Sequence, residues 1–340
     1  MKALVRTSLL FVIVLVSLSA YLRLAHSGIG CSDWPNCYGL IGEPPAVSQP
    51  ITGKNAYQRI VAEASQPLAW ATPLHRVVAS VLGLLIMFLV MLAFRQKKDR
   101  LISLTLLLVT VFLALLGVKS GGLHSLAVVM GNLSGGFLML GLLGWMLFKD
   151  GGSRNADQSQ PALAGKLAAF AVFLLVIQIL MGGLTSANFA ATACQSLPDC
   201  HGSWLPGADV FKAMDLSREH KVTSMGQAIG GQERTDIHIA HRLGAVITAV
   251  MVVAVGFMAW RSGGRLRFAG GVVLALVSIE FSIGVVAIAA GLPIGLAVAH
   301  NWMAGLLLLG MLKIVALNRQ ELSGLEFHPS DDIRQQSVAS

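Results

Sequence analysis

The sequence has few charged and few aromatic residues. Asp, Glu, Lys and Arg together make up 12% of its 340 residues, and Phe, Trp and Tyr make up 7%. Soluble domains contain about 25% charged residues. Because hydrophobic residues account for 55% of the chain, the few charges cannot cover the surface of a water-soluble fold of this size. That class of protein is therefore excluded.

The hydrophobic residues gather into eight blocks, each close to the roughly 20 residues that a helix needs to cross a bilayer. This pattern predicts an all-α polytopic membrane protein with eight transmembrane helices. The blocks cover residues 7–24, 73–94, 101–118, 124–148, 163–185, 237–260, 266–290 and 294–317.

The net charge of +8 predicts an orientation in the membrane. It forms no basic stripe with interleaved aromatic residues, so a nucleic-acid partner is not expected. If every block spans, most Lys and Arg residues fall on one side, which the positive-inside rule makes cytoplasmic. We therefore predict a protein of the bacterial inner-membrane type with both termini in the cytoplasm and the segments 25–72 and 186–236 outside. A cleaved signal peptide is the less favoured interpretation of the first block.

The two halves of the chain resemble each other in three places. Two cysteines separated by five residues open each long outer segment, a His-Arg pair begins the second and the sixth block, and an Asn-led apolar run lies in the fourth and the eighth. The matching residues are Cys31 and Cys37 with Cys194 and Cys200, His75-Arg76 with His241-Arg242, and Asn132 to Gly141 with Asn301 to Gly310.

This repeat predicts two tandem four-helix bundles. Because each bundle has an even number of spans, the two repeats are expected to share one orientation and to be related by a pseudo-two-fold axis along the membrane normal. The predicted units are a repeat at 1–150, a polar cytoplasmic linker at 151–162, a second repeat at 163–317 and a cytoplasmic tail at 318–340.

The four cysteines predict two disulfides, Cys31 with Cys37 and Cys194 with Cys200, because the outer compartment is oxidising. Two interpretations remain open for each pair. It is either a structural staple of the loop or a redox-active pair that exchanges with a partner protein. A zinc site is disfavoured because its cysteines usually lie closer together in sequence.

Three histidines of the predicted spans stand out by their depth, because an ionisable side chain there is costly unless it is paired or binds a metal. His241 and His300 are predicted at similar depth on the second and fourth helices of the second bundle. Two such histidines can hold a haem iron from both faces. His75 begins the corresponding helix of the first repeat. Arg76 and Arg242 suit haem propionates, or else they anchor the helix at the membrane interface.

The first repeat departs from this arrangement. Gly131 stands where the alignment places the partner of His300, and His124 lies seven residues earlier, about 10 Å nearer the membrane surface. Two outcomes remain open: an iron held by His75 with one open face, or no haem in this repeat.

Three further polar residues lie within or near the spans. Glu280 is either part of a proton relay or a buried packing partner, and Gln178 is expected to join two helices by a hydrogen bond. His238 lies three residues before His241, as a partner of that histidine or as an interface residue.

The run from Arg23 to Gly39, which contains Cys31, Asp33-Trp34-Pro35 and Cys37, is the most specific pattern in the chain. Together with the His-Arg pairs and the repeat of four helices, it resembles the haem A synthase family. These membrane enzymes complete haem A for cytochrome oxidases. The resemblance covers residues 1–317.

The resemblance implies that haem b lies between His241 and His300 as an electron-transferring cofactor. It also implies that the first repeat binds haem O and oxidises the C8 methyl group, through a hydroxymethyl stage, to the formyl group of haem A, with His75 as the catalytic residue. Such oxidation of a strong C–H bond requires an oxidant and an electron path. The resemblance also implies that Cys31 and Cys37 take part in haem transfer or in redox chemistry.

The resemblance further implies certain partners. Haem O synthase would supply the substrate, an electron donor that the sequence does not name would supply electrons, and a homo-oligomer in the lipid bilayer is compatible with the sequence.

Haem A synthase activity is the leading interpretation, and two departures from the family pattern leave an alternative function open. Many members carry a glutamate three residues before the first-repeat histidine, where this chain has Thr72, and a fourth histidine where it has Gly131. The alternative is a divergent, non-catalytic haem-binding membrane cytochrome or oxidase assembly factor. A transporter built on parallel repeats is disfavoured, because no interrupted helix recurs in both halves.

Overall fold

The computed structural model describes residues 1–26, 40–41, 71–119, 126–150, 162–218, 221–222 and 228–325. Within these ranges, eight helices are long and apolar enough to cross a membrane, which confirms the predicted all-α membrane class. The helices are α1 (Lys2–His26), α3 (Ala71–Arg95), α4 (Arg100–Lys119), α5 (Leu126–Phe148), α6 (Ala162–Ala187), α8 (Gln232–Arg261), α9 (Gly264–Ala289) and α10 (Ile294–Leu325). Which end of each helix faces the cytoplasm stays a prediction.

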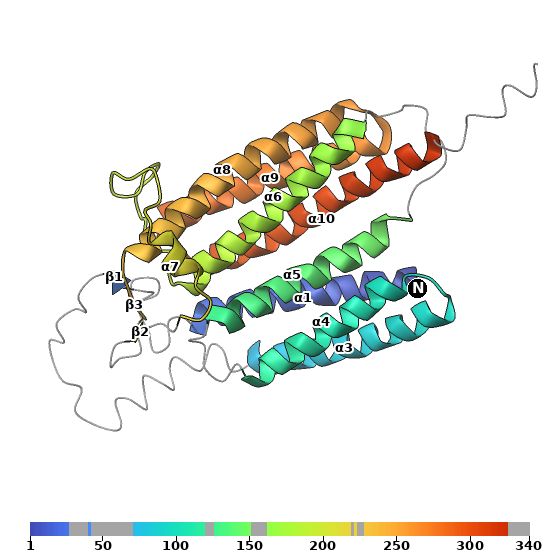
Figure 1. The fold of residues 1–340 in the computed structure, drawn as a ribbon, viewed down its shortest axis with the longest axis horizontal. Coiled ribbons are helices and arrows are strands. Elements are labelled where there is room, and N and C mark those ends of the chain that lie inside the picture. The colour runs from blue at the N-terminus through green and yellow to red at the C-terminus, as the bar shows by residue number, and fades with distance from the viewer. Residues whose placement is uncertain are drawn as a thin grey trace, which may run out of the picture.

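A short helix and three short strands gather at one end of the long helices (Figure 1). They are α7 (Val210–Met214), β1 (Leu40–Ile41), β2 (Lys221–Val222) and β3 (Ala228–Gly230). The strand order is β1-β3-β2, with β1 parallel and β2 antiparallel to β3. Because β1 comes from the first predicted outer segment and β3 from the second, these two segments meet at the same end of the molecule.

The long helices pack in two groups of four (Figure 1). In the first group α1 contacts α3 and α5, and α4 contacts both of these; in the second, α6 contacts α8 and α10, and α9 contacts both of these. Between the groups, α5 contacts α10, while α1 contacts α10 and α6 contacts α5. These contacts are the ones expected of two bundles with matched helices. The pseudo-two-fold relation between them stays a prediction.

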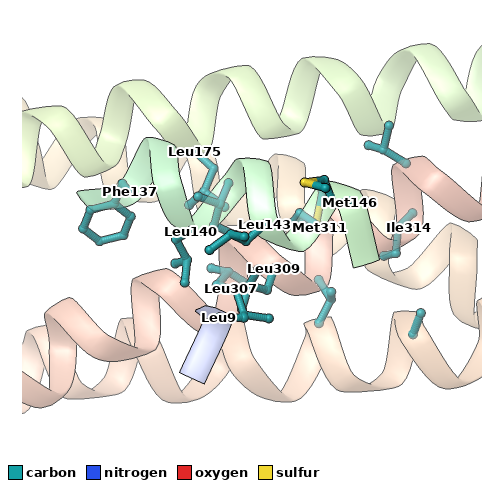
Figure 2. Close-up of a cluster of buried hydrophobic side chains, with 14 of the residues drawn as sticks. Leu9, Phe137, Leu140, Leu143, Met146, Leu175, Leu307, Leu309, Met311 and Ile314 are labelled. Carbon is teal, nitrogen blue, oxygen red and sulfur yellow. The ribbon is translucent and has the colours of Figure 1, made fainter. Parts of the chain in front are cut away.

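The largest apolar core lies where the two groups meet (Figure 2). Two glycines bring α5 and α10 close together: a side chain at Gly144 would collide with Leu309, and a Cβ at Gly305 would lie 3.1 Å from Leu140 Cδ2. Small residues at such crossings let helices in a membrane gain van der Waals contact. The core residues labelled in Figure 2 are Leu9, Phe137, Leu140, Leu143, Met146, Leu175, Leu307, Leu309, Met311 and Ile314.

At the end of the molecule opposite the short strands, ion pairs join the turn between α3 and α4 to the end of α5. Lys149, just after α5, pairs with Asp99 in the turn between α3 and α4, and the Asp99 side chain is only 5% exposed. Lys98 Nζ lies 2.6 Å from Asp150 Oδ2. The hydrogen bond from Lys98 lowers the pKa of the Asp150 carboxyl below its usual range. The turn between α3 and α4 is thus fastened to the end of α5.

Helix α10 continues to Leu325, eight residues beyond the predicted end of the last block at 317. The added turns carry polar residues that still have partners. Asn318 is buried and donates a hydrogen bond to the Ile314 carbonyl, and the Arg319 guanidinium lies 5.1 Å from the centre of the Trp145 ring. Hydropathy ends the predicted span at the first polar residue, whereas these contacts support further helix.

Helices α8 and α9 approach each other most closely at Gly270, and we predict that Gly270→Ala destabilises the protein. A Cβ at Gly270 would collide with the Trp260 backbone nitrogen and lie 2.5 Å from the Gly256 carbonyl oxygen. Backbone atoms cannot move aside as a flexible side chain can. A cost of about 1–3 kcal/mol is expected for such overpacking, measured as a lower melting temperature in detergent.

Gly271→Ala is the matched control, since a Cβ there meets only Trp260 Cδ1 at the ordinary distance of 3.7 Å. If the two variants melted at the same temperature, the proposed close contact between α8 and α9 would be wrong.

Candidate functional site: a histidine pair in the second bundle

The structure brings together two of the three predicted intramembrane histidines. His241 lies nine residues after the start of α8, and His300 lies six residues after the start of α10. Their ring centroids are 6.4 Å apart, and the ring planes are nearly perpendicular at 88°. The two imidazoles therefore face each other inside the second group of helices.

Each ring packs against a glycine on a neighbouring helix. A Cβ at Gly182 of α6 would lie 3.0 Å from His241 Cε1, and a Cβ at Gly284 of α9 would lie 3.2 Å from His300 Cε1. Contacts this short leave little room for a side chain. The two glycines therefore let the imidazoles lie directly against the helix backbones, a role that hydropathy alone did not reveal.

The Nδ1 atom of each ring faces a polar side chain one turn before that glycine. Gln178 Nε2 lies 2.9 Å from His241 Nδ1 and also donates a hydrogen bond to the His241 carbonyl oxygen. Glu280 Oε1 lies 3.3 Å from His300 Nδ1. Among the described residues, no hydrogen bond engages Nε2 of either ring. Nε2 is therefore the nitrogen that each histidine offers to a ligand.

The distance between the rings is suited to one metal ion held by both. A metal bound to two imidazole nitrogens at about 2 Å from each would separate the ring centroids by about 6 Å. The observed separation of 6.4 Å between His241 and His300 matches this value. Two facing histidines from separate helices of a bundle are also the usual axial ligands of a six-coordinate haem. The residues present thus fit a haem iron.

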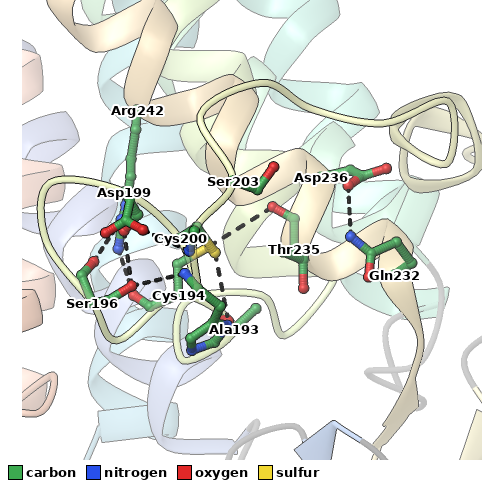
Figure 3. The surroundings of a disulfide bond; sticks show 12 residues. Ala193, Cys194, Ser196, Asp199, Cys200, Ser203, Gln232, Thr235, Asp236 and Arg242 are labelled. Carbon is green, nitrogen blue, oxygen red and sulfur yellow. Dashed lines mark hydrogen bonds between the residues drawn. A yellow bond between two sulfur atoms is a disulfide. The ribbon is translucent and has the colours of Figure 1, made fainter.

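Arg242, predicted to bind a haem propionate, is bonded to the loop between α6 and α8 (Figure 3). Its Nη1 donates to the carbonyl oxygens of Ser196 at 2.8 Å and Asp199 at 3.1 Å, and its Nη2 donates to the carbonyl oxygen of Cys194. Arginine presents its donors in a rigid fork that suits such a set of acceptors. The contact of Arg242 with a propionate stays a prediction, but its position next to His241 connects this loop to the histidine pair.

The predicted disulfide between Cys194 and Cys200 is present (Figure 3). Both residues are buried, at 0% and 2% exposed. The Cys194 sulfur lies 3.9 Å from the Thr235 carbonyl oxygen, and the disulfide packs against Ile239 of α8. Because labile disulfides are generally strained or exposed, this burial favours the structural staple over exchange with a redox partner.

Helix α8 begins at Gln232, five residues before the predicted start of the sixth block at 237. The charged residues that lowered the hydropathy there are bonded to the loop. Arg218 donates from Nη1 to Glu233 Oε1 at 2.9 Å and from Nη2 to Asn188 Oδ1 at 2.8 Å. The loop therefore supplies the partners that water would otherwise provide, and the helix extends.

Two further charged residues of this first turn are almost completely buried. Arg234 and Asp236 are each 1% exposed. Arg234 donates to the Phe189 carbonyl oxygen, and Asp236 Oδ1 accepts a 3.0 Å hydrogen bond from Gln232 Nε2. The only sequence signal for these buried charged residues is their position directly before an apolar helix.

His238, predicted as a partner of His241 or as an interface residue, faces the loop after α6. It is 4% exposed and hydrogen-bonds the backbone of Ala190. This contact fits the interface residue.

The first four helices differ at the corresponding place. His75 lies near the start of α3 and is partly exposed, and Arg76 is exposed. A Cβ at Gly131 of α5 would lie 2.7 Å from Leu116 Cδ1 and 3.5 Å from Phe112 Cζ. Apolar side chains of α4 thus fill the space beside Gly131. His124, Cys31 and Cys37, and the side chain of Thr72, lie outside the described residues.

The chain is similar in sequence to a known protein family and to several known proteins. The sequence model of the COX15-CtaA family, described as cytochrome oxidase assembly protein, matches residues 2–312. A haem A synthase of Shewanella oneidensis is 32% identical over 316 residues, which cover 92% of this chain and 94% of that protein. A haem A synthase of Neorickettsia sennetsu is 23% identical over 325 residues, 88% of this chain and 93% of that protein. A protoheme IX farnesyltransferase of Halobacterium salinarum is 34% identical over 135 residues, which cover 39% of this chain but only 23% of that protein.

We predict that Arg242→Lys accelerates reduction of the Cys194–Cys200 disulfide. A lysine ammonium cannot span the three carbonyl oxygens that the Arg242 guanidinium holds. Each hydrogen bond to a charged group is worth about 1.5–3 kcal/mol, so loss of one makes opening of the loop at least about tenfold more favourable. The rate is measured with dithiothreitol, mass-tag labelling of the released thiols and identification of the tagged peptides.

The control for this variant is Arg267→Lys, because the Arg267 guanidinium lies over the Trp260 ring on α8, remote in sequence from the disulfide loop. Reduction of Arg242→Lys at the wild-type rate would show that this arginine does not hold the loop closed.

Proposed function

Because the chain belongs to the COX15-CtaA family of cytochrome oxidase assembly proteins, we propose that it is a haem A synthase, a membrane oxidoreductase that converts haem O to haem A. The family match and the 32% identity to a haem A synthase over 92% of the chain support this reaction. The observation that carries the proposal is the histidine pair of the second bundle, whose rings face each other at 6.4 Å. Such a pair equips the chain for electron transfer through haem.

The proposed cofactor is haem b, held through Nε2 of His241 and His300. When bound, haem b supplies a one-electron carrier inside the bundle. The chain contributes the positions of the two ligands: Gln178 and Glu280 contact their Nδ1 atoms, so the rings are oriented before the cofactor arrives. Iron binding through Nε2 requires the His241 proton on Nδ1. A 180° rotation of the Gln178 amide would let Oε1 accept from that Nδ1–H, at the cost of the hydrogen bond from Gln178 Nε2 to the His241 carbonyl oxygen.

The proposed substrate is haem O, bound by the first bundle with His75 as the catalytic residue. Its C8 methyl group would be oxidised to a hydroxymethyl group and then to the formyl group of haem A. The first stage adds one oxygen atom, and each stage removes two electrons and two protons, which an oxidant from outside the chain must take up. His75 is the counterpart of His241 in the sequence repeat, while Gly131 replaces the counterpart of His300. A bundle with a single axial ligand suits a haem that must enter and leave, whereas two ligands suit a resident cofactor.

The proposed source of haem O is a haem O synthase in the same membrane. The similarity of part of this chain to a protoheme IX farnesyltransferase supports a connection with that pathway. The electron donor and a homo-oligomeric state are not identified by any contact of the described residues.

A non-catalytic haem-binding cytochrome or assembly factor is the second candidate. One observation favours it: the apolar side chains of Leu116 and Phe112 occupy the space beside Gly131, where many family members have a histidine. This candidate keeps the haem b site and loses only the oxidation of haem O.

Haem conversion separates the two candidates. Cells that make this protein together with a haem O synthase are expected to contain haem A or its hydroxymethyl precursor, identified by pyridine haemochrome spectra and mass spectrometry. His75→Ala is expected to abolish this conversion while the purified protein still carries haem b. Recovery of haem b with unconverted haem O from the wild-type protein would instead establish the non-catalytic candidate.

The ligand assignment is tested separately by spectroscopy. His241→Ala and His300→Ala are each expected to abolish the low-spin haem b spectrum of the purified protein, because a six-coordinate iron needs both axial nitrogens. His201→Asn is the control: His201 is exposed in the outer loop with a φ of 52°, a conformation that asparagine tolerates. A low-spin spectrum that survives either alanine substitution would exclude that histidine as a ligand.

A further inference from the structure

We propose that Glu280 is a positioning residue for His300 that lowers the reduction potential of the haem held by the second bundle. This inference rests on the proposed haem b site. The inference rests on a difference between the two imidazoles: the Glu280 carboxylate lies beside His300, whereas the neutral Gln178 amide lies beside His241.

Glu280 lies within an apolar helix and has one polar neighbour that is close. Its side chain is 14% exposed, and Oε1 lies 3.3 Å from His300 Nδ1. Oε2 is buried and has no hydrogen-bond partner among the described residues. A carboxylate in a membrane span is costly, so a contact with a functional group is the expected reason for its presence.

No lysine or arginine of α9 lies close enough to pair with the Glu280 carboxylate. The nearest basic residue on its own helix is Arg267, thirteen residues away or about 20 Å along the helix axis. Within the described residues, no Lys or Arg pairs with Glu280, and its one close partner is the His300 imidazole, which is charged only when protonated.

The two helices that support the histidines use the same spacing. On α6, Gln178 contacts His241 Nδ1, and Gly182, four residues later, accommodates the His241 ring. On α9, Glu280 and Gly284 have the same spacing and serve His300 in the same way. Residues four apart lie on one face of a helix, so each supporting helix offers a polar group and a gap one turn apart.

The helices of the first bundle that correspond to α6 and α9 are α1 and α4, and their described residues lack this pattern. The sequence of α1 contains no glycine, and the residue four before Gly117 of α4 is Leu113. The pattern therefore accompanies the complete histidine pair and is absent from the corresponding described helices of the first bundle.

The difference between Gln178 and Glu280 has an electrostatic consequence. A carboxylate that accepts a hydrogen bond from the Nδ1–H of a metal-binding histidine orients the ring and makes it a stronger donor to the metal. Ferric haem carries one more positive charge than ferrous haem, and a nearby negative charge favours the ferric form. The neutral amide of Gln178 exerts no such effect through His241. Glu280 thus favours the ferric form of the haem and lowers its reduction potential.

The test is a spectroelectrochemical titration of the purified, haem-loaded full-length protein. Glu280→Gln keeps the shape of the side chain and removes its charge. At the wild-type midpoint, the ferrous-to-ferric ratio is expected to rise about tenfold, which for one electron is a shift of about 59 mV to higher potential. Ser278→Ala, at an exposed position on α9, is the control and is expected to leave the midpoint unchanged.

Gln178→Glu is the converse variant, because it places a carboxylate against His241 Nδ1. It is expected to lower the midpoint potential, a response that a purely structural role of either residue would not produce. Glu280→Asp keeps the charge and is expected to retain most of the wild-type potential.

The outcomes distinguish this inference from the proposed function. An unchanged midpoint in Glu280→Gln, with wild-type haem content and spectrum, overturns the role of Glu280 and leaves the haem b site intact. If Glu280→Gln binds no haem, the result of Gln178→Glu decides: a lower midpoint supports the inference, and an unchanged or higher midpoint overturns it. Wild-type protein without low-spin haem b would instead contradict the proposed function itself.

Discussion

The structure depends on one constraint: a polar group within the apolar helices must find its partner in the protein, because the hydrocarbon core of a membrane supplies no water. The histidine pair meets this constraint through Gln178 and Glu280, which contact Nδ1 of His241 and His300. The same contacts leave Nε2 of each ring for a haem iron. The side chains that approach the two imidazoles thus also set the orientation of the two proposed axial ligands.

Buried polar groups also have partners within the protein at the end of the second bundle where α8 begins. Buried charges at the start of α8 bond to the loop after α6, as Arg234 does to the Phe189 carbonyl oxygen. Arg242, directly after His241, bonds to three carbonyl oxygens of the loop that the Cys194–Cys200 disulfide closes. The disulfide, the loop and the proposed haem ligand therefore form one connected unit, in which the loop covers the bundle and α8 carries the ligand.

The two bundles differ in a way that fits a division of labour between a resident cofactor and an exchanged substrate. The second bundle has two facing histidines, each supported by a polar residue and a glycine one turn apart. In the first, apolar side chains of α4 adjoin Gly131, and the described residues of α3, α4 and α5 include one histidine, His75. A ligand set that holds haem from both faces slows its release, while a single ligand permits exchange. The helices α5 and α10 meet at the apolar core between the two groups of helices.

The sequence by itself determined the membrane class, the eight spans, the Cys194–Cys200 disulfide and the similar depth of His241 and His300, because hydropathy and spacing along the chain are local properties. Only the tertiary structure decided which side chains serve each histidine. Gln178 and Glu280 were recognisable as polar residues in apolar helices, but their partners depend on the rotation and axial offset of one helix against another. The same holds for Gly182 and Gly284, which matter only because an imidazole lies against them. Tertiary partners also explain why α8 begins at Gln232 and α10 continues to Leu325: hydropathy ends a span where polar residues become frequent, whereas tertiary partners for those residues let the helix extend.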